Sequence, residues 1–178
     1  MMRLSYERDR MKMHGLICAL IFAAGVSVTG ADLLAVKPAR PISVKKLDAL
    51  EAQAIEAMKQ KAAELNIQGV AVVNYAPGDK VDSWTSKMAV VGRMIDPKAS
   101  ANGNNLLGIA YAKSSEMADT LIDSGTAKRP PMTGEFGWQG GVIGEVKGGH
   151  IIVSFSGGKS EDDVQVSKAG LAVMEKGM

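Results

Sequence analysis

The fold of this chain is decided by the stretch Gly140-Gly-Val-Ile-Gly-Glu-Val-Lys-Gly-Gly-His-Ile-Ile-Val-Ser-Phe-Ser-Gly-Gly158, which continues as Lys159-Ser-Glu-Asp-Asp163. Two apolar runs, 142–146 and 150–155, flank Lys147-Gly-Gly149 and predict an antiparallel hairpin. Ser160 with Asp163 three residues later predicts the capped start of a closing helix. The glycines before the hairpin belong to a long loop at 124–141, and a loop of this length in a compact domain is commonly functional.

The rest of the chain alternates between helical and extended patterns. Apolar residues spaced by three, four and seven predict helices at 45–66 and 106–123, and the closing helix spans 160–177. A β-branched run predicts a strand at 69–75, and 81–95 predicts one or two more strands with Trp84, Met88, Val90 and Val91 in the core. This order predicts an α/β (α+β) sandwich with a single antiparallel sheet of about five strands flanked by helices.

The N-terminal residues have the pattern of a secretory signal peptide. Residues 14–31 are almost uncharged, follow Arg8, Arg10 and Lys12, and end in Thr29-Gly-Ala31, where small residues suit cleavage. The alternative is an uncleaved membrane anchor, although the run is short for a spanning helix. We therefore expect a signal at 1–31, an extended arm or linker at 32–44, one domain at 45–178, no stable anchor after cleavage, and a periplasmic or extracellular location.

Composition narrows the classes of function. Residues 1–31 hold four basic and two acidic residues, so residues 32–178, with 17 of each sign, have no formal net charge. No basic patch with interleaved aromatic residues remains, which argues against nucleic acid as a partner. The one cysteine, Cys18, lies in the signal, so the exported chain is expected to contain neither a disulfide nor a thiolate metal site.

Four residues are candidates for binding, each with a plain structural alternative. Arg93 could pair a ligand carboxylate or simply Asp96 or Asp163. Lys113 is predicted to lie on the apolar face of the second helix, where a lysine commonly extends its ammonium to solvent. Trp138 lies among flexible glycines and suits a flat ligand or a subunit contact. His150 could ligate iron, act as an acid or base, or face solvent at a strand edge.

A phosphate-binding loop is excluded at Gly157-Gly-Lys-Ser160. The Walker motif requires glycine five positions before Gly158, and that position holds Val153. The acidic residues that follow Ser160 would also repel a phosphate. Nucleotide hydrolysis therefore has no support in this sequence.

From about Lys45 to Met174, the chain resembles the GlcG/HbpS-like haem-degrading-domain family. The matching segments occur in the order of the family: Leu50–Ala63, Gly69-Val-Ala-Val-Val, Arg93-Met-Ile-Asp96, Ala110-Tyr-Ala-Lys113, Gly140-Gly141, Ser156-Gly157, and Asp163 through Ala169-Gly170. The chain departs from the pattern where Ile95 precedes Asp96 and where Val142 follows the glycine pair.

The resemblance implies a profilin-like sandwich that assembles into homo-oligomers and binds haem or another flat cofactor or small molecule. It implies that Arg93 and Lys113 meet propionates, that Trp138 stacks on the ring, and that His150 is the axial metal ligand. Haem degradation and redox sensing are the activities it suggests, and whether this chain is an enzyme stays open. The alternatives are a non-enzymatic structural oligomer that has lost its site and an enzyme acting on a small organic acid.

Overall fold

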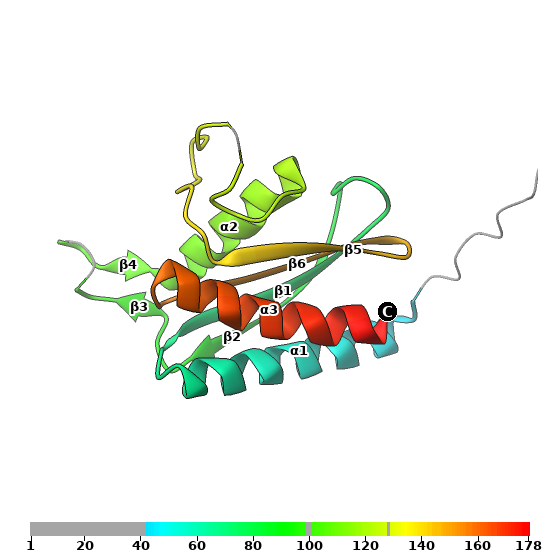
Figure 1. The fold of residues 1–178 in the computed structure, drawn as a ribbon, viewed down its shortest axis with the longest axis horizontal. Coiled ribbons are helices and arrows are strands. Elements are labelled where there is room, and N and C mark those ends of the chain that lie inside the picture. Colours follow the sequence, from blue (N-terminus) through cyan, green and yellow to red (C-terminus); the bar gives the residue numbers. More distant parts are fainter. Residues whose placement is uncertain (1–41, 99–100, 128) are drawn as a thin grey trace, which may run out of the picture. The chain divides into compact units, whose positions relative to one another are not determined.

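A computed structural model describes residues 42–98, 101–127 and 129–178. The predicted signal peptide and most of the predicted arm lie outside these residues. The described chain forms one compact unit (Figure 1). Its elements, in order, are α1 (Val44–Glu64), β1 (Gly69–Pro77), β2 (Thr85–Val91), β3 (Ile95–Asp96), β4 (Asn104–Asn105), α2 (Leu106–Thr120), β5 (Gly141–Val146), β6 (Gly149–Ser156) and α3 (Ser160–Gly177).

The main sheet is antiparallel and has the strand order β2-β1-β6-β5. The central pair, β1 and β6, is buried along nearly its whole length, and its register joins Val70 to Ser156 and Pro77 to Gly149. The predicted hairpin is present, since β5 and β6 pair down to Val146 and Gly149. This antiparallel sheet is the central layer of the sandwich that the sequence predicts.

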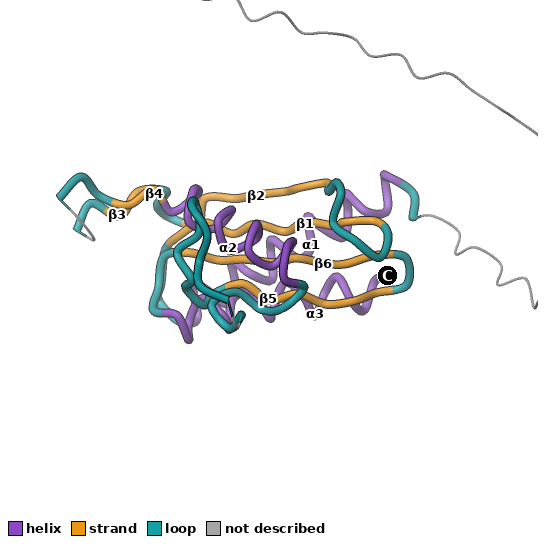
Figure 2. The backbone as a smooth tube through the Cα atoms, turned by 90° about the horizontal axis from the view of Figure 1, so that it is seen from above, coloured by secondary structure: helices purple, strands orange, loops and turns teal. Residues whose placement is uncertain are grey.

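Helices cover the sheet unequally (Figures 1 and 2). The two long helices α1 and α3 lie on one face and bury the larger core, which includes Met58, Phe155 and Met174. The shorter helix α2 lies on the other face over β1 and β6 and buries a smaller core. Every second residue of a strand faces the same side of the sheet. The strand residues that face α2 include polar side chains as well as apolar ones.

The buried polar side chains on the α2 face form one hydrogen-bonded group. Asn74 donates to the Ser114 hydroxyl at 3.2 Å and to the Ile152 carbonyl at 3.3 Å. The hydroxyls of Ser114 and Ser154 lie 3.0 Å apart, and Ser154 donates to the Ala110 carbonyl at 2.8 Å. These bonds fix the position of α2 on the sheet, since buried polar groups are costly without partners.

The predicted fold class is confirmed, and three details of the prediction are wrong. The main sheet has four strands, and the remaining extended residues form a separate two-stranded sheet of β3 and β4. Met88 and Val90 are exposed rather than core residues, because α2 does not extend over β2. Ser160 does not cap α3, whose N-cap residue Lys159 makes no side-chain capping bond, and Asp163 instead accepts from the Gly158 N–H at 2.8 Å.

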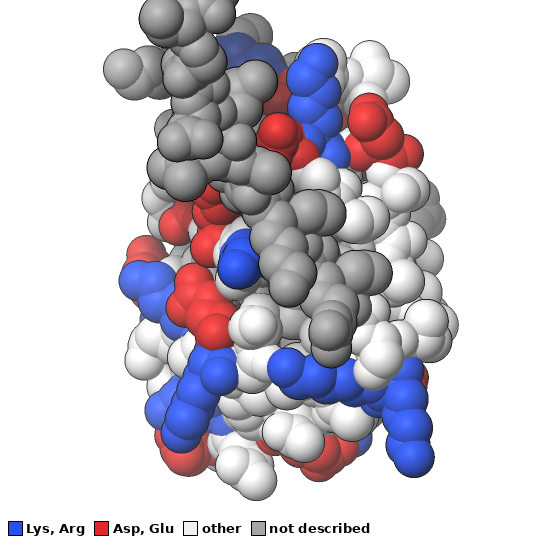
Figure 3. Space-filling view, turned by 90° about the vertical axis from the view of Figure 1, so that its right-hand side faces the viewer, with Lys and Arg blue, Asp and Glu red and all other residues white. Residues whose placement is uncertain are grey.

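Within the described residues, no helix is long and apolar enough to cross a membrane. Figure 3 shows the end of the domain that carries the β5–β6 turn, where basic and acidic side chains are interspersed over the visible surface.

Candidate functional site

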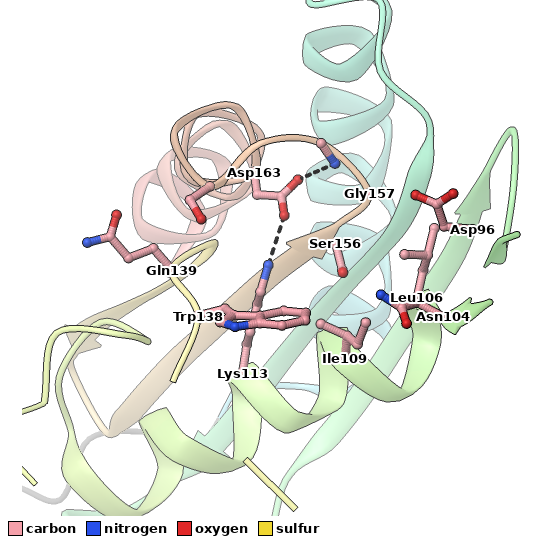
Figure 4. Close-up of a pocket in the computed structure, with 12 residues that line it drawn as sticks. Asp96, Asn104, Leu106, Ile109, Lys113, Trp138, Gln139, Ser156, Gly157 and Asp163 are labelled. Atoms are coloured by element: carbon pink, nitrogen blue, oxygen red, sulfur yellow. Dashed lines mark hydrogen bonds and ion pairs between the residues drawn. The ribbon is translucent and has the colours of Figure 1, made fainter. Parts of the chain in front are cut away.

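A pocket lies where β6 ends and α3 begins, beside the first turns of α2 (Figure 4). Its volume is about 170 Å³. The lining residues come from four separate segments of the sequence: Asp96, Asn104, Leu106, Ile109, Lys113, Trp138, Gln139, Ser156, Gly157, Gly158, Ser160 and Asp163. Polar and apolar groups therefore meet at one place on the α2 side of the sheet.

Lys113 forms the inner end of this pocket. Its side chain is only 3% exposed, and its ammonium donates to Asp163 Oδ2 and to the Phe155 carbonyl, both at 2.8 Å. Burial lowers the pKa of Lys113, and the neighbouring Asp163 carboxylate opposes that shift. The lysine is thus an internal ion-pair partner, and the expectation that its ammonium reaches solvent is not met.

Asp163 is the site residue that sequence reasoning missed, because its position indicated a helix cap or a pair with Arg93, whereas its partner is Lys113. Burial raises the pKa of its carboxyl, whereas Lys113 and the Gly158 N–H lower it. The Lys113–Asp163 pair connects α2 to the start of α3, and the Phe155 carbonyl connects both to β6. Two segments of the family resemblance, Ala110-Tyr-Ala-Lys113 and Asp163 through Ala169-Gly170, were the signal that could have indicated this pairing.

Gly140 makes room for the ion pair. Its φ is +132°, and a Cβ atom there would lie 2.2 Å from Lys113 Nζ and 2.8 Å from Asp163 Cβ. A side chain at this position would therefore collide with the pair. The Gly140-Gly141 segment is thus required by packing at the site as well as by the turn into β5.

Arg93 is not among the residues that line the pocket, but it contacts two of them, Asp96 and Gly157. It pairs with Asp96, with 3.2 Å between Nη2 and Oδ2, and donates to the Gly157 carbonyl at 3.1 Å. Its Nε is buried and has no partner among the described residues. The structural alternative for Arg93, a pair with Asp96, is present, and the arginine also holds the loop between β6 and α3 in place.

Trp138 lines the same pocket as Lys113, and in the view of Figure 4 its ring overlaps the Lys113 side chain. The indole is 46% exposed and stacks on Phe136 with 4.8 Å between ring centroids. Upstream in the same loop, Arg129 pairs with Asp119 of α2 and with Glu135. Hydrogen bonds from Arg129 and the Met132 N–H hold the pKa of Glu135 at about 2, well below its usual value.

His150 does not join the other three predicted residues. It lies at the opposite end of β6, six positions before Ser156, which corresponds to about 20 Å along a strand. It is buried opposite Ala76 and Glu145, and its Nδ1 has no hydrogen-bond partner in the described chain. No group of three or more metal-ligating His, Cys, Asp or Glu side chains occurs among the residues that the structure describes.

Comparison with known proteins supports the fold. No family model matches the chain, and no curated protein matches it in sequence. A solved structure described as the PduOC:heme complex is similar, with a TM-score of 0.50 and 16% identity, and the match covers 75% of this chain and 95% of that one. At this identity the likeness shows a common fold, and it agrees with the sandwich predicted from the sequence.

Proposed function

We propose that this protein binds haem, or a flat ligand of similar chemistry, with one edge in the Lys113 pocket. The observation that carries the proposal is the position of Trp138, an exposed aromatic ring that lines a polar pocket containing the Lys113 ammonium, while Arg93 pairs with the lining residue Asp96. The likeness to a structure with bound heme supports the same ligand class.

The size of the pocket limits how a tetrapyrrole could bind. Pockets for drug-sized ligands measure about 300–1,000 Å³, whereas this pocket measures about 170 Å³. Only an edge of the ring, such as a propionate, could enter the pocket, and the ring plane would lie outside against Trp138. The hydroxyls of Ser156 and Ser160 would then contact this edge of the ligand. The Lys113 and Arg93 side chains would contact it only after their present ion pairs with carboxylates open.

Iron ligation does not fit the same pocket. Its described lining contains no His, Cys, Met or Tyr, and His150 lies about 20 Å from Ser156 along β6. Bound haem would supply a redox-active iron, but these residues offer that iron no axial ligand. We therefore assign Trp138, Lys113 and Arg93 to peripheral contacts and derive no chemistry at the metal.

Haem titration of the purified protein tests this proposal. We expect a shifted Soret band and quenching of tryptophan fluorescence at micromolar protein. Trp138→Ala should weaken binding about tenfold, in line with the ~0.5–1.5 kcal/mol that an aromatic pair contributes beyond its buried area. Trp84→Phe is the matched control and should bind like the wild type. The absence of binding, or equal binding by Trp138→Ala, would exclude this site.

The same titration separates the roles of the histidine. If His150 is not an axial ligand, His150→Ala will give the same absorption spectrum as the wild type. Loss of the Soret shift in this variant would restore the axial role implied by the family resemblance. Haem degradation or redox sensing would need a further measurement, namely loss of the Soret band with time in the presence of a reductant and oxygen.

A small organic acid is the second candidate ligand, and the pocket volume of about 170 Å³ favours it. A carboxylate of a few carbon atoms could enter completely and meet Lys113 at the inner end. Thermal-shift screening of a carboxylate panel, followed by turnover assays of the hits, tests this candidate. Stabilisation that disappears in Arg93→Gln would support it, and a silent panel would count against it.

We also propose that the protein is exported through its N-terminal segment. The support is the charged start, apolar centre and small-residue end of residues 1–31. Cell fractionation with N-terminal sequencing of the exported form tests the proposal, and cleavage after Ala31 is expected. A full-length chain found only in the cytoplasm would overturn it.

A further inference from the structure

The two edges of the main sheet differ in a way that indicates an interaction surface. At the β5 edge, the Gly141 N–H donates to Ser124 Oγ at 2.8 Å and the Ile143 N–H donates to Asp123 Oδ1 at 2.9 Å. The Ser124 N–H also donates to the Gly141 carbonyl at 3.3 Å. The segment that follows α2 therefore already occupies the Gly141 end of this edge.

The β2 edge has no such cover among the described residues. In an antiparallel sheet, the backbone N–H and C=O groups of successive residues point alternately to the two sides of a strand. The bond that the Phe155 N–H donates to the Gly140 carbonyl shows that Phe155 points to the β5 side of β6. When this alternation is followed through the strand registers, the backbone groups of Ser86, Met88 and Val90 lie on the side of β2 that faces away from β1. An open edge of this kind is a template for another strand.

The side chains of β2 lack the usual protection of an edge strand. The seven-residue strand contains no proline, and its one charged residue, Lys87, is already paired with Asp48 of α1 at 2.5 Å. On the opposite side of the strand, Met88 is 36% exposed and Val90 is 46% exposed. Exposed edges normally carry free charges, proline or bulges that prevent pairing, so this strand is suited to pairing.

We propose that β2 pairs antiparallel with β2 of a second copy of this chain, about a two-fold axis at Met88. Met88 is the midpoint of the strand Thr85–Val91. This register places Met88 opposite Met88 of the second copy, and Ser86 opposite Val90. Each of these pairs exchanges two backbone hydrogen bonds, so every outward backbone group of the three residues gains a partner.

The occupant is a second copy because the strand is complementary to itself in this register. The exposed Met88 and Val90 of both copies form one apolar patch on the α2 side. On the α1 side, Lys87 lies opposite Ala89 of the second copy, so no two like charges face each other directly. A two-fold interface requires this kind of self-complementary surface.

Disulfide trapping tests both the pairing and its register in the full chain, with Cys18→Ser as background. Met88→Cys should form a covalent dimer on mild oxidation, because the two Cα atoms would lie about 5.5 Å apart. Val90→Cys is the register control: its two copies would lie about 14 Å apart at ~3.4 Å per residue, beyond the ~7 Å limit for a disulfide. No dimer from Met88→Cys, or equal dimer from both variants, would overturn the proposal.

Light scattering after gel filtration provides a second measurement without cysteines. The wild type should contain an even number of chains, and Met88→Lys should reduce that number at unchanged circular dichroism, because it places two lysines opposite each other. Met132→Lys removes a more exposed methionine elsewhere (51% against 36% for Met88) and should leave the assembly intact. A monomeric wild type, or an unchanged assembly in Met88→Lys, would contradict the proposed interface.

Discussion

Lys113 and Asp163 show how one buried ion pair determines the local chemistry of this domain. The two side chains are 3% and 5% exposed, and each has lost most of its hydration. The pair survives because the Phe155 carbonyl and the Gly158 N–H supply additional hydrogen bonds. Removing one partner of a buried ion pair lowers the stability far more than replacing both partners with apolar residues, since one uncompensated charge stays buried.

Lys113→Met should therefore destabilise the protein by about 3–5 kcal/mol, the usual cost of removing one partner of a buried pair. Without the ammonium, burial raises the pKa of Asp163 further, so the folded state holds a proton that the unfolded state releases above its ordinary pKa. Stability of this variant should then fall as the pH rises from about 4 towards neutrality. Urea unfolding at several pH values measures both effects.

The double variant Lys113→Met with Asp163→Asn is the control for that prediction. It removes the carboxyl and should lose the pH dependence at this site while recovering part of the stability. A single Lys113→Met variant as stable as the wild type at pH 7 would show that the pair contributes nothing to folding.

Gly140→Ala should be destabilising for a separate reason at the same place. The backbone strain at φ +132° costs about 1–3 kcal/mol, and the contact of 2.2 Å with Lys113 Nζ adds to it. Gly134→Ala is the matched control, because that residue has φ +95° but a Cβ atom there would meet nothing within 4 Å. Chemical denaturation should give a larger loss for Gly140→Ala; equal losses would mean that the ion pair moves without cost.

At the scale of elements, the loop 124–140 depends on one arginine. Arg129 bridges Asp119 on α2 and Glu135 within the loop, and Glu135 also accepts from the Met132 N–H at 2.8 Å. These bonds favour the ionised form of Glu135 and raise the pKa of Arg129 above its ordinary value. The loop that carries Trp138 is thus held by charge rather than by a large apolar contact.

Acid should release this loop. The pKa of Glu135 falls from 4.5 to about 2 in the folded state, so its contribution is complete above about pH 4.5 and is lost as the pH falls through about 2. Carboxyl-carbon NMR should give a midpoint near 2 for Glu135, together with a change in Trp138 fluorescence in a Trp84→Phe background. An ordinary midpoint near 4.5 would show that the Arg129 bridge does not persist in solution.

Most elements could be predicted from spacing alone, and the failures have clear physical reasons. Periodicity located α1, α2 and α3 to within a few residues, and the turn at Lys147-Gly148 located the β5–β6 hairpin. Met88 and Val90 were predicted to be buried because alternation shows that a strand has an apolar face but not whether a helix covers it. His150 was grouped with Trp138 on the family resemblance, because the sequence does not show which end of β6 borders the pocket.

At the scale of the whole described domain, the two faces of the sheet differ: one carries the larger core and the other carries the pocket. The face under α1 and α3 holds the larger apolar core. The face under α2 holds the smaller core, the buried Asn74–Ser114–Ser154 group and the pocket. Because α2 leaves β2 uncovered, the same asymmetry exposes the strand that we propose to pair between copies.

Assembly through β2 makes thermal stability depend on protein concentration. Subunit association stabilises the folded state by mass action, so the melting temperature of the wild type should rise with each tenfold increase in concentration. Met88→Lys should melt at a temperature that does not change with concentration. Differential scanning calorimetry over two decades of concentration measures the difference, and parallel behaviour of the two proteins would contradict the expectation.

The bonds from Asp123 and Ser124 to β5 also limit how far such an assembly can grow. A sheet with two free edges can recruit strand after strand and become a fibril. Here the N–H groups of Gly141 and Ile143 are already engaged, so strand addition is hindered at the β5 edge and favoured at the β2 edge. Asp123→Ala combined with Ser124→Ala would remove this terminator and should convert a finite particle into one that polymerises.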